Sequence, residues 1–409
     1  MEETEPFALG APESYIRVQT SYYKRCRQPT IQGDYVELWI PWSSETLRQD
    51  LPRKQVKKIR RFDGFCCVPS HLHYQEAVGN FYNLYHPLPW QPEEGPCSQT
   101  LFFLRHIFGE QYELGLDYLA LLYRSPTQHL PVLCLVSRER KTGKTTFLNL
   151  LKLIFGRNVT FNGNSDFRSQ FNSDWMNTLL IAVDEVLLGR KEDSEKIKNL
   201  STARTAKIEA KGKDRRETEF FGKFVLCSNN EEDFLVIEPT ETRYWVRKVP
   251  PLERENIHLL HQMRQEAPQL LHLLLRRPLS VPQGLTRMWF SEKQLRTDAL
   301  LRVMQGSRNK VETELLLLLR ELFEATGDGQ LCFTAKDMLE LLRRHMPRLS
   351  RQEVRRVLQR EWGLVPATNS LSYQTYRYDA QGEPCQVRLT GRFYSVSQGW
   401  LRQRLDESS

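Results

Sequence analysis

The sequence predicts an α/β fold built on a parallel sheet, followed by a smaller domain of helices and a β-hairpin. Three apolar runs, each ending in polar residues, predict buried central strands at 132–136, 179–183 and 224–227. A helical pattern follows the first run after a short polar loop, so strand, loop and helix occur in that order. Ligands of such sheets bind where the strands end, so the polar residues there are the first candidates for a site.

The composition indicates a soluble protein of several compact units. A chain of 409 residues predicts two or three domains, and 40% apolar residues suffice for ordinary cores. No apolar stretch approaches the roughly 20 residues of a membrane helix. The start, Met1 to Glu5, lacks the features of a signal peptide, so we expect a cytoplasmic protein with no membrane partner. The eight scattered cysteines indicate reduced thiols.

Changes of pattern along the chain divide it into four regions. A break at Gly306-Ser307 marks the last boundary. The expected regions are an irregular N-terminal segment with short strands at 1–95, a sheet-and-helix core with a preceding helical segment at 96–253, a helical linker or lid at 254–306, and a final domain at 307–409.

The final domain resembles a winged helix, because three helical segments precede two β-like runs. The helices are expected near 310–325, 335–346 and 350–362, and the strands at Ser372 to Tyr378 and Gln386 to Val396. Arg356 and Arg360 point away from the apolar face of the third helix, which makes them candidates for nucleic-acid contact. Residues 336–409 carry 13 Lys+Arg against 8 Asp+Glu, a net charge of +5 that agrees with a polyanionic partner.

The loop after the first strand has the second half of a phosphate-loop pattern. Such a loop turns backbone N–H groups, a helix N-terminus and a lysine toward phosphate oxygens. The usual pattern is G-x-x-x-x-G-K-[ST], but here Arg138 replaces the first glycine. Lys144 is expected to contact the β and γ phosphates, and the Thr145 hydroxyl to ligate Mg²⁺. The residues expected to cradle the nucleotide are Lys141, Thr142, Gly143, Lys144, Thr145 and Thr146.

Polar residues at the ends of the next two strands extend this candidate site. Asp184 is expected to hold Mg²⁺, directly or through water, and Glu185 to orient the attacking water. An exposed turn is the plainer interpretation of this pair, and the phosphate loop upstream argues against it. The Asn229 amide is a candidate partner for the γ-phosphate or the water, although taken by itself an ordinary Asn-Asn turn is the favoured interpretation.

Two further features have both a functional and a plain interpretation. Arg243 is suited to stabilise charge at a neighbouring subunit's γ-phosphate, while a surface salt bridge is an equal alternative. Residues 207–220 predict a hairpin whose basic tip carries Lys211, Lys213 and Arg215. That tip suits contact with a DNA backbone, but a solvated basic turn has the same composition.

Taken in order, these motifs resemble a superfamily 3 helicase, the compact AAA+-related class of viruses, phages and mobile elements. The likeness runs from about Leu130 to Val249 and is strongest to the helicase part of phage- and plasmid-type primase-helicases. It implies an AAA+-like P-loop core in a ring, expected to be a hexamer, that hydrolyses ATP with Mg²⁺ between subunits. Arg243 would act across the interface, and Lys211 and Lys213 would grip single-stranded DNA. The winged helix would add contact with origin duplex DNA, and a separate chain would supply any primase.

Two departures from that family keep other hypotheses open. Arg138 stands at the first glycine, and Thr242 precedes Arg243 where the family often has two adjacent arginines. The alternative is therefore a non-motor DNA-binding replication initiator or regulator with a degenerate nucleotide site. A small-molecule P-loop kinase is a weaker third. The Cys and His residues at 66–73 favour a local core contact over zinc, because adjacent cysteines suit a tetrahedral site poorly.

Overall fold

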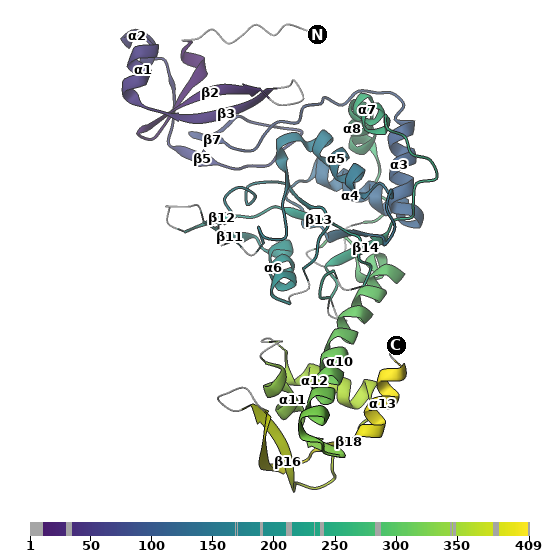
Figure 1. Ribbon diagram of the computed structural model, residues 1–409. Helices are drawn as coiled ribbons and strands as arrows, with labels where there is room; N and C mark the ends of the chain where they lie inside the picture. Colours follow the sequence, from purple (N-terminus) through teal and green to yellow (C-terminus); the bar gives the residue numbers. More distant parts are fainter. Residues whose placement is uncertain are drawn as a thin grey trace. The chain divides into compact units, whose positions relative to one another are not determined.

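The chain forms two compact units in the computed structural model (Figure 1). The first comprises Met1–Glu185, Ile197–Asn229 and Arg243–Leu295, and the second comprises Val186–Lys196, Asn230–Thr242 and Arg296–Ser409. The structure describes residues 11–29, 35–167, 169, 171–188, 191–209, 215–232, 234–237, 241–282, 288–343, 346, 349–378 and 384–407.

The N-terminal part of the first unit contains the short strands expected there, but they and two longer strands form ordered sheets, so the segment is more regular than its sequence indicates. A four-stranded sheet has the order β3-β2-β1-β4, and a three-stranded sheet has the order β5-β7-β6. Strands β2 and β3 carry Tyr, Lys, Arg and Trp on half-exposed faces, which hides the apolar alternation of a strand. The elements are η1 (Pro12–Ser14), β1 (Tyr15–Val18), β2 (Ser21–Pro29), β3 (Tyr35–Trp42), α1 (Ser44–Asp50), α2 (Arg53–Val56), β4 (Arg60–Phe62), β5 (Gly64–Cys66), β6 (Ala77–Val78) and β7 (Phe81–Asn83).

The core of the first unit is a five-stranded parallel sheet with the order β14-β8-β13-β10-β9. Its strands are β8 (Val132–Val136), β9 (Val159–Phe161), β10 (Leu180–Val183), β13 (Lys223–Ser228) and β14 (Tyr244–Lys248). The three strands predicted from apolar runs are therefore confirmed, and every residue of β8, β10 and β13 is buried. Because β13 lies between β8 and β10, the carboxyl ends of all three meet at one edge.

Helices pack around this sheet, including those expected to form a linker. They are α3 (Ser98–Phe108), η2 (Gly109–Gln111), α4 (Tyr112–Arg124), α5 (Lys144–Phe155), η3 (Gly156–Asn158), α6 (Lys191–Thr202), α7 (Leu259–Gln265), α8 (Ala267–Arg276) and α9 (Glu292–Leu295), with the hairpin β11 (Thr205–Ile208) and β12 (Arg216–Glu219). Helix α8 packs against α4, where the buried Asp117 accepts hydrogen bonds from Arg277 Nε (2.9 Å) and Ser280 N (2.8 Å). Residues 254–295 thus belong to the first unit. None of the described helices has the length and apolar character needed to cross a bilayer.

The second unit combines helices with two antiparallel strand pairs. Its elements are α10 (Asp298–Thr326), β15 (Gln330–Phe333), α11 (Ala335–Leu342), α12 (Arg351–Arg356), the π-helical turn η4 (Val357–Glu361), β16 (Leu371–Tyr378), β17 (Pro384–Gly391), β18 (Tyr394–Ser397) and α13 (Gln398–Glu407). Strand β16 pairs with β17, and β18 returns to pair with β15. Capping boxes at Thr334 and Ser350 begin α11 and α12.

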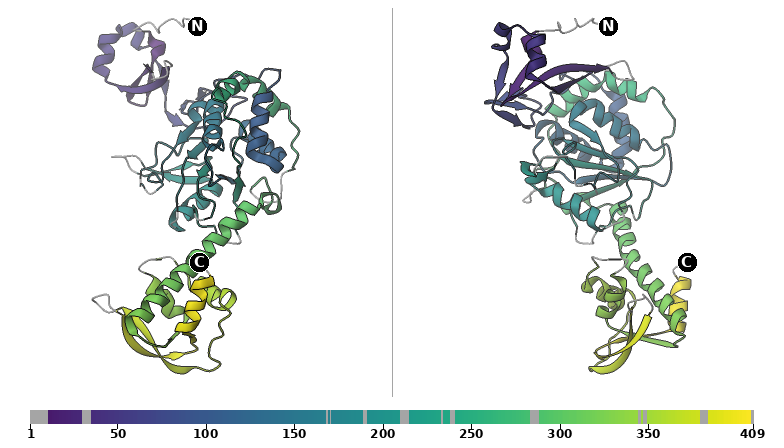
Figure 2. Two further views of the ribbon diagram at one scale, coloured as in Figure 1. Left: turned by 45° about the vertical axis from the view of Figure 1, so that its right-hand side comes forward. Right: turned by 60° about the vertical axis from the view of Figure 1, so that its left-hand side comes forward.

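The break expected at Gly306-Ser307 is absent, because α10 runs through it as one helix (Figure 2). A Cβ at Gly306 would lie 2.4 Å from the carbonyl oxygen of Glu232. The glycine therefore permits a close backbone approach within the second unit and does not end the helix. The boundary between the units precedes α10, between Leu295 and Arg296.

Candidate functional site: a phosphate loop beside an acidic pair

The phosphate loop joins β8 to α5, and Gly143 is the residue that ends it. Its φ of +86° lies in the left-handed region, which favours glycine. A Cβ there would also lie 2.9 Å from Cε2 of Phe103. Backbone conformation and packing thus both require glycine. Helix α5 starts at Lys144, buries Phe147 and Leu148, and ends at Gly156.

Three elements outside the loop hold its backbone in place. Ser137 N donates to Ser228 O at the end of β13 (3.1 Å). Nε2 of His106, from α3, lies 3.0 Å from the carbonyl oxygen of Thr142. The carbonyl of Lys141 accepts from Leu252 N (3.0 Å), beyond β14. The loop shape is therefore set by tertiary contacts. His106 escaped sequence reasoning because a histidine on an amphipathic helix carries no motif.

The Arg138 position does not require glycine in this loop. Among the described residues, positive φ angles outside glycine occur at Gln19, Lys141 and Glu185 only, so the left-handed residue of the loop besides Gly143 is Lys141 (φ +58°). Arg138 is exposed to solvent. The missing glycine thus brings no backbone strain at residue 138.

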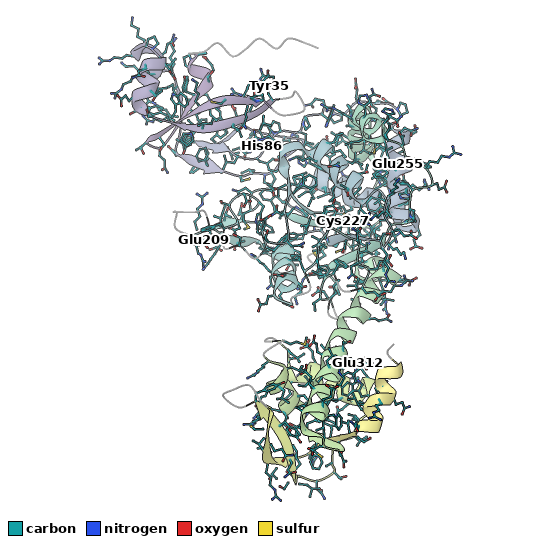
Figure 3. All side chains as sticks on the ribbon, viewed as in Figure 1. Tyr35, His86, Glu209, Cys227, Glu255 and Glu312 are labelled. Atoms are coloured by element: carbon teal, nitrogen blue, oxygen red, sulfur yellow. The ribbon has the colours of Figure 1, made fainter. Side chains whose placement is uncertain are left out.

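Lys144 is held inside the loop. Its side chain is buried, and Nζ donates to Ser137 O (3.3 Å) and to Thr142 Oγ1 (3.2 Å). By contrast, Lys141 points outward and forms an exposed ion pair with Glu255 (2.7 Å; Glu255 is labelled in Figure 3). The two lysines of the loop therefore have different surroundings: the Lys144 ammonium group is enclosed by the loop, and that of Lys141 is exposed.

The two predicted metal ligands are in direct contact. Thr145 Oγ1 donates to Asp184 Oδ2 at 2.7 Å, and Asp184 Oδ1 accepts from Glu185 N at 3.1 Å. Thr145 is the second residue of α5, and Asp184 follows β10. Thr146 is half-buried one residue further along the helix. A hydroxyl and a carboxylate so placed are the oxygen ligands that Mg²⁺ prefers, so the residues present fit that ion.

Glu185 has an unusual backbone. Its φ is +55°, and its side chain is exposed, next in sequence to Asp184. Its carbonyl accepts a hydrogen bond from Asn164 Nδ2 (3.2 Å), and Asn164 belongs to no recognisable sequence motif. A left-handed conformation without glycine costs roughly 1–3 kcal/mol, and such strain concentrates at functional sites. This conformation marks Glu185 independently of the motif.

Asn229 and Arg243 lie at opposite edges of the sheet. Asn229 is exposed and directly follows Ser228, whose carbonyl binds the start of the loop. Arg243 is half-buried and precedes β14, and its carbonyl accepts from Val132 N at the start of β8 (2.9 Å). A strand of 5 residues separates that edge from the loop, a distance of about 16 Å. Asn229 therefore lies at the same end of the sheet as the loop, while the Arg243 backbone lies at the opposite end.

The residues predicted to bind nucleic acid are only partly described. The hairpin β11–β12 is present, but Lys211 and Lys213 at its tip lie outside the described residues. Arg215 pairs with the Glu209 carboxylate across the hairpin. Arg360 is exposed and Arg356 half-buried on the α12–η4 segment. Their roles stay predictions.

The cysteine and histidine cluster has local partners. His71 Nδ1 lies 2.7 Å from Tyr123 O and Nε2 lies 2.6 Å from Tyr85 Oη. Burial lowers the pKa of His71 to about 4, so the ring is neutral and donates from Nδ1 to the carbonyl. Cys67 Sγ donates to Asn177 O (3.5 Å). Both side chains therefore make the local contacts favoured from the sequence.

Comparison with known proteins bears on this region and on the whole fold. A family model described as "Family of unknown function (DUF5906)" matches residues 135–244, which contain the loop, the acidic pair, the hairpin, Asn229 and Arg243. No curated protein matches the sequence.

Solved structures resemble the chain over nearly its full length. The apo structure of the NrS-1 C-terminal region has a TM-score of 0.54 at 16% identity, covering 92% of this chain and 96% of that one. An A-form apo structure of the same region gives 0.53 at 17%, covering 92% and 94%. A JCV helicase structure scores 0.31 at 13%, covering 54% and 62%. The chain thus shares the α/β fold of the NrS-1 C-terminal region.

Proposed function

We propose that this chain is an ATP-driven motor on single-stranded DNA, a helicase or translocase serving replication of a phage, plasmid or other mobile element. One observation carries the proposal. Thr145 Oγ1, in the first turn of α5, and Asp184 Oδ2, just after β10, lie 2.7 Å apart, and Thr145 directly follows the buried Lys144. This is the arrangement that a P-loop nucleoside triphosphatase needs to hold a divalent ion against a triphosphate.

The proposal gives each residue of the site a task. Backbone N–H groups ending at Gly143 and the N-terminus of α5 bind phosphate oxygens, and Lys144 neutralises them. Thr145 and Asp184 would hold Mg²⁺, which when bound offsets charge on the phosphate oxygens. Glu185 accepts a hydrogen bond from the attacking water and orients it. The Asn229 amide, exposed at the same edge, donates to the water or to the terminal phosphate.

The position of Arg243 supports a site completed by a second copy. Arg243 lies about 16 Å from its own loop along β14, so a role at a γ-phosphate requires the loop of a neighbour. We therefore propose that copies with an AAA+-like core assemble into a ring. As in the superfamily 3 helicases that the sequence resembles, this ring would be a hexamer. The strand order supports that core, because β13 lies between the loop strand β8 and the acidic strand β10. The second unit has the helix and hairpin order of a winged helix.

The test is ATP hydrolysis with and without single-stranded DNA. The wild type is expected to turn over faster with DNA, and Glu185→Gln to retain nucleotide binding while losing about 10²-fold or more in rate. Phosphate release and binding of a fluorescent ATP analogue measure the two quantities separately. Wild-type turnover that ignores DNA would refute the motor. Tight nucleotide binding without any turnover would instead support the non-motor initiator or regulator that Arg138 suggested.

A further inference from the structure

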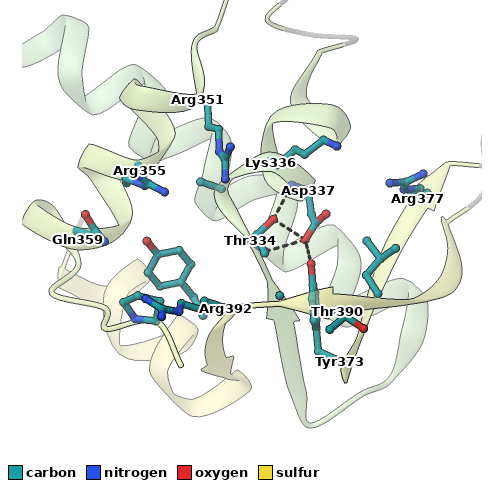
Figure 4. A pocket seen from close by; sticks show the side chains of 15 residues that line it. Thr334, Lys336, Asp337, Arg351, Arg355, Gln359, Tyr373, Arg377, Thr390 and Arg392 are labelled. Atoms are coloured by element: carbon teal, nitrogen blue, oxygen red, sulfur yellow. Dashed lines mark hydrogen bonds between the residues drawn. The ribbon is translucent and has the colours of Figure 1, made fainter. Parts of the chain in front are cut away.

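The second unit contains a cleft whose walls are rich in positive charge. Its volume is about 670 Å³, and it lies between α11, α12 and the hairpin β16–β17 (Figure 4). We call it the basic cleft. Five cations line it: Lys336, Arg351, Arg355, Arg377 and Arg392. All five are exposed, so their charges are available to a ligand that enters from solvent.

We propose that the basic cleft binds the phosphate backbone of duplex DNA. The proposal deepens the proposed function by naming the residues through which the second unit would bind duplex DNA, and it rests on that function only for the identity of the nucleic acid as DNA. The cleft is assembled from residues that no sequence motif marks. Arg356 and Arg360, the two arginines of this unit predicted to contact nucleic acid, do not line it.

The cations lie along two walls. Arg351, Arg355 and Gln359 recur every fourth residue and form a row along the α12 segment, while Arg377 lies on the opposite wall in β16 (Figure 4). One helical repeat of this kind advances about 6 Å. A row with that spacing contacts successive groups of a chain of phosphates, whereas a single small anion would need donors converging on one point.

The floor of the cleft is a fixed scaffold. Asp337 is buried, and its Oδ2 accepts from Thr334 N (2.8 Å), Thr334 Oγ1 (2.8 Å) and Tyr373 Oη (2.7 Å). These bonds tie the start of α11 to β16. Because three donors satisfy this carboxylate, its role is to hold the scaffold together.

Acidic neighbours offset the cations only in part. Glu340 pairs with Arg377 (3.3 Å) and more distantly with Lys336 (3.8 Å). Arg351, Arg355 and Arg392 form no ion pair with any residue in the described part of the chain. Three of the five cations can thus contact phosphate groups without first giving up an ion pair with another described residue.

The aromatic residues favour duplex over single-stranded DNA. Sites for single strands offer exposed rings on which bases stack. The two rings that line this cleft, Tyr373 and Tyr394, are buried at 6% and 4% exposure. Tyr373 stacks on Phe393 with ring centres 4.9 Å apart. The cleft therefore presents charge without a stacking surface, which suits a backbone whose bases are paired and turned away.

The test compares two double variants of the full-length chain. Arg351→Ala/Arg355→Ala removes two cations of the cleft, and Arg343→Ala/Arg402→Ala removes two exposed cations from the same unit outside it. Fluorescence anisotropy with a labelled 30-base-pair duplex gives Kd over a range of salt concentrations. The cleft variant is expected to weaken binding at least tenfold and to reduce the slope of log K against log[salt] by about 2, while the control changes neither.

Other outcomes decide between ligands. Equal Kd and slope in the two variants would overturn the proposal, and so would a loss confined to a single-stranded probe. Competition by millimolar inorganic phosphate or ATP would show a site for small anions and overturn it as well. Arg351→Lys/Arg355→Lys keeps the charges and should keep the slope, which separates charge loss from misfolding. Basal ATP hydrolysis is measured in parallel, so failure of the motor and failure of the cleft are distinguishable.

Discussion

The phosphate loop and the basic cleft both suit phosphate, but they are built in different ways. The loop is one continuous segment, with a single buried lysine and a backbone shaped by three neighbouring elements. The cleft collects exposed cations from two helices and a hairpin. A site contained in one segment leaves a readable pattern in the sequence. A site assembled from separate elements becomes visible only once those elements have been placed.

Burial also gives the two sites different sensitivities to substitution. A charge inside a low-dielectric loop interacts strongly with its ligand, and no neighbouring group can replace it. Exposed arginines are screened by salt and share their task with others. A single substitution in the loop should therefore abolish ATP turnover, whereas a single substitution in the cleft should only weaken DNA binding.

The largest effect is expected at Lys144. Lys144→Ala should lower ATP turnover by about 10²–10³-fold, because it removes a charge preorganised against the phosphates. Lys141→Ala, in the same loop but exposed, should cost less than about tenfold, since it loses only a surface ion pair. Phosphate-release assays on both variants measure the contrast. Equal losses would break the distinction drawn between the two lysines.

A mixing experiment tests whether the site belongs to two copies. Arg243→Ala and Lys144→Ala should each be almost inactive alone. Mixed, they should regain part of the wild-type ATPase rate, because an intact loop from one variant meets an intact arginine from the other. Activity is measured against mixing ratio. An Arg243→Ala protein that remains fully active, or mixtures no better than their components, would contradict a role in a neighbour's site.

A smaller effect is expected for single arginines of the cleft. Arg355→Ala should reduce the salt slope of duplex binding by about 0.9, the contribution of one phosphate contact. Arg360→Ala, on the same helical segment but outside the cleft, should leave the slope unchanged. Anisotropy titrations at several salt concentrations give both slopes. If Arg360→Ala reduced the slope and Arg355→Ala did not, the nucleic-acid contact would lie at Arg360, as predicted from the sequence, and not in the cleft.

Acid should weaken the first unit through His71. Burial holds its pKa at about 4, against an ordinary 6.5, so the unfolded chain takes up a proton that the folded one does not. The stabilisation is complete above pH 6.5 and is lost as the pH falls toward 4. Urea unfolding across this range should show a smaller pH dependence in His71→Asn than in the wild type. His73→Asn, at an exposed position, serves as the control.

Much of the core was predictable, and the misses have physical causes. The strands ending at Val136, Val183 and Ser228 are buried on both faces, so apolar runs identified them. The pairing of Thr145 with Asp184 followed, because parallel strands end together. The N-terminal sheet was missed because its strands are half-exposed and highly charged. Gly306 misled because glycine breaks some helices, and here it accommodates the backbone of Glu232.

The placement of Arg243 before β14 has a consequence for when the molecule would consume ATP. If the arginine serves a neighbour, a solitary copy has a nucleotide pocket without its last charged group. Turnover per molecule should then rise with protein concentration and level off once copies assemble. Dilution into single copies would therefore stop ATP hydrolysis, and only copies that have already assembled, for example on DNA, would consume ATP.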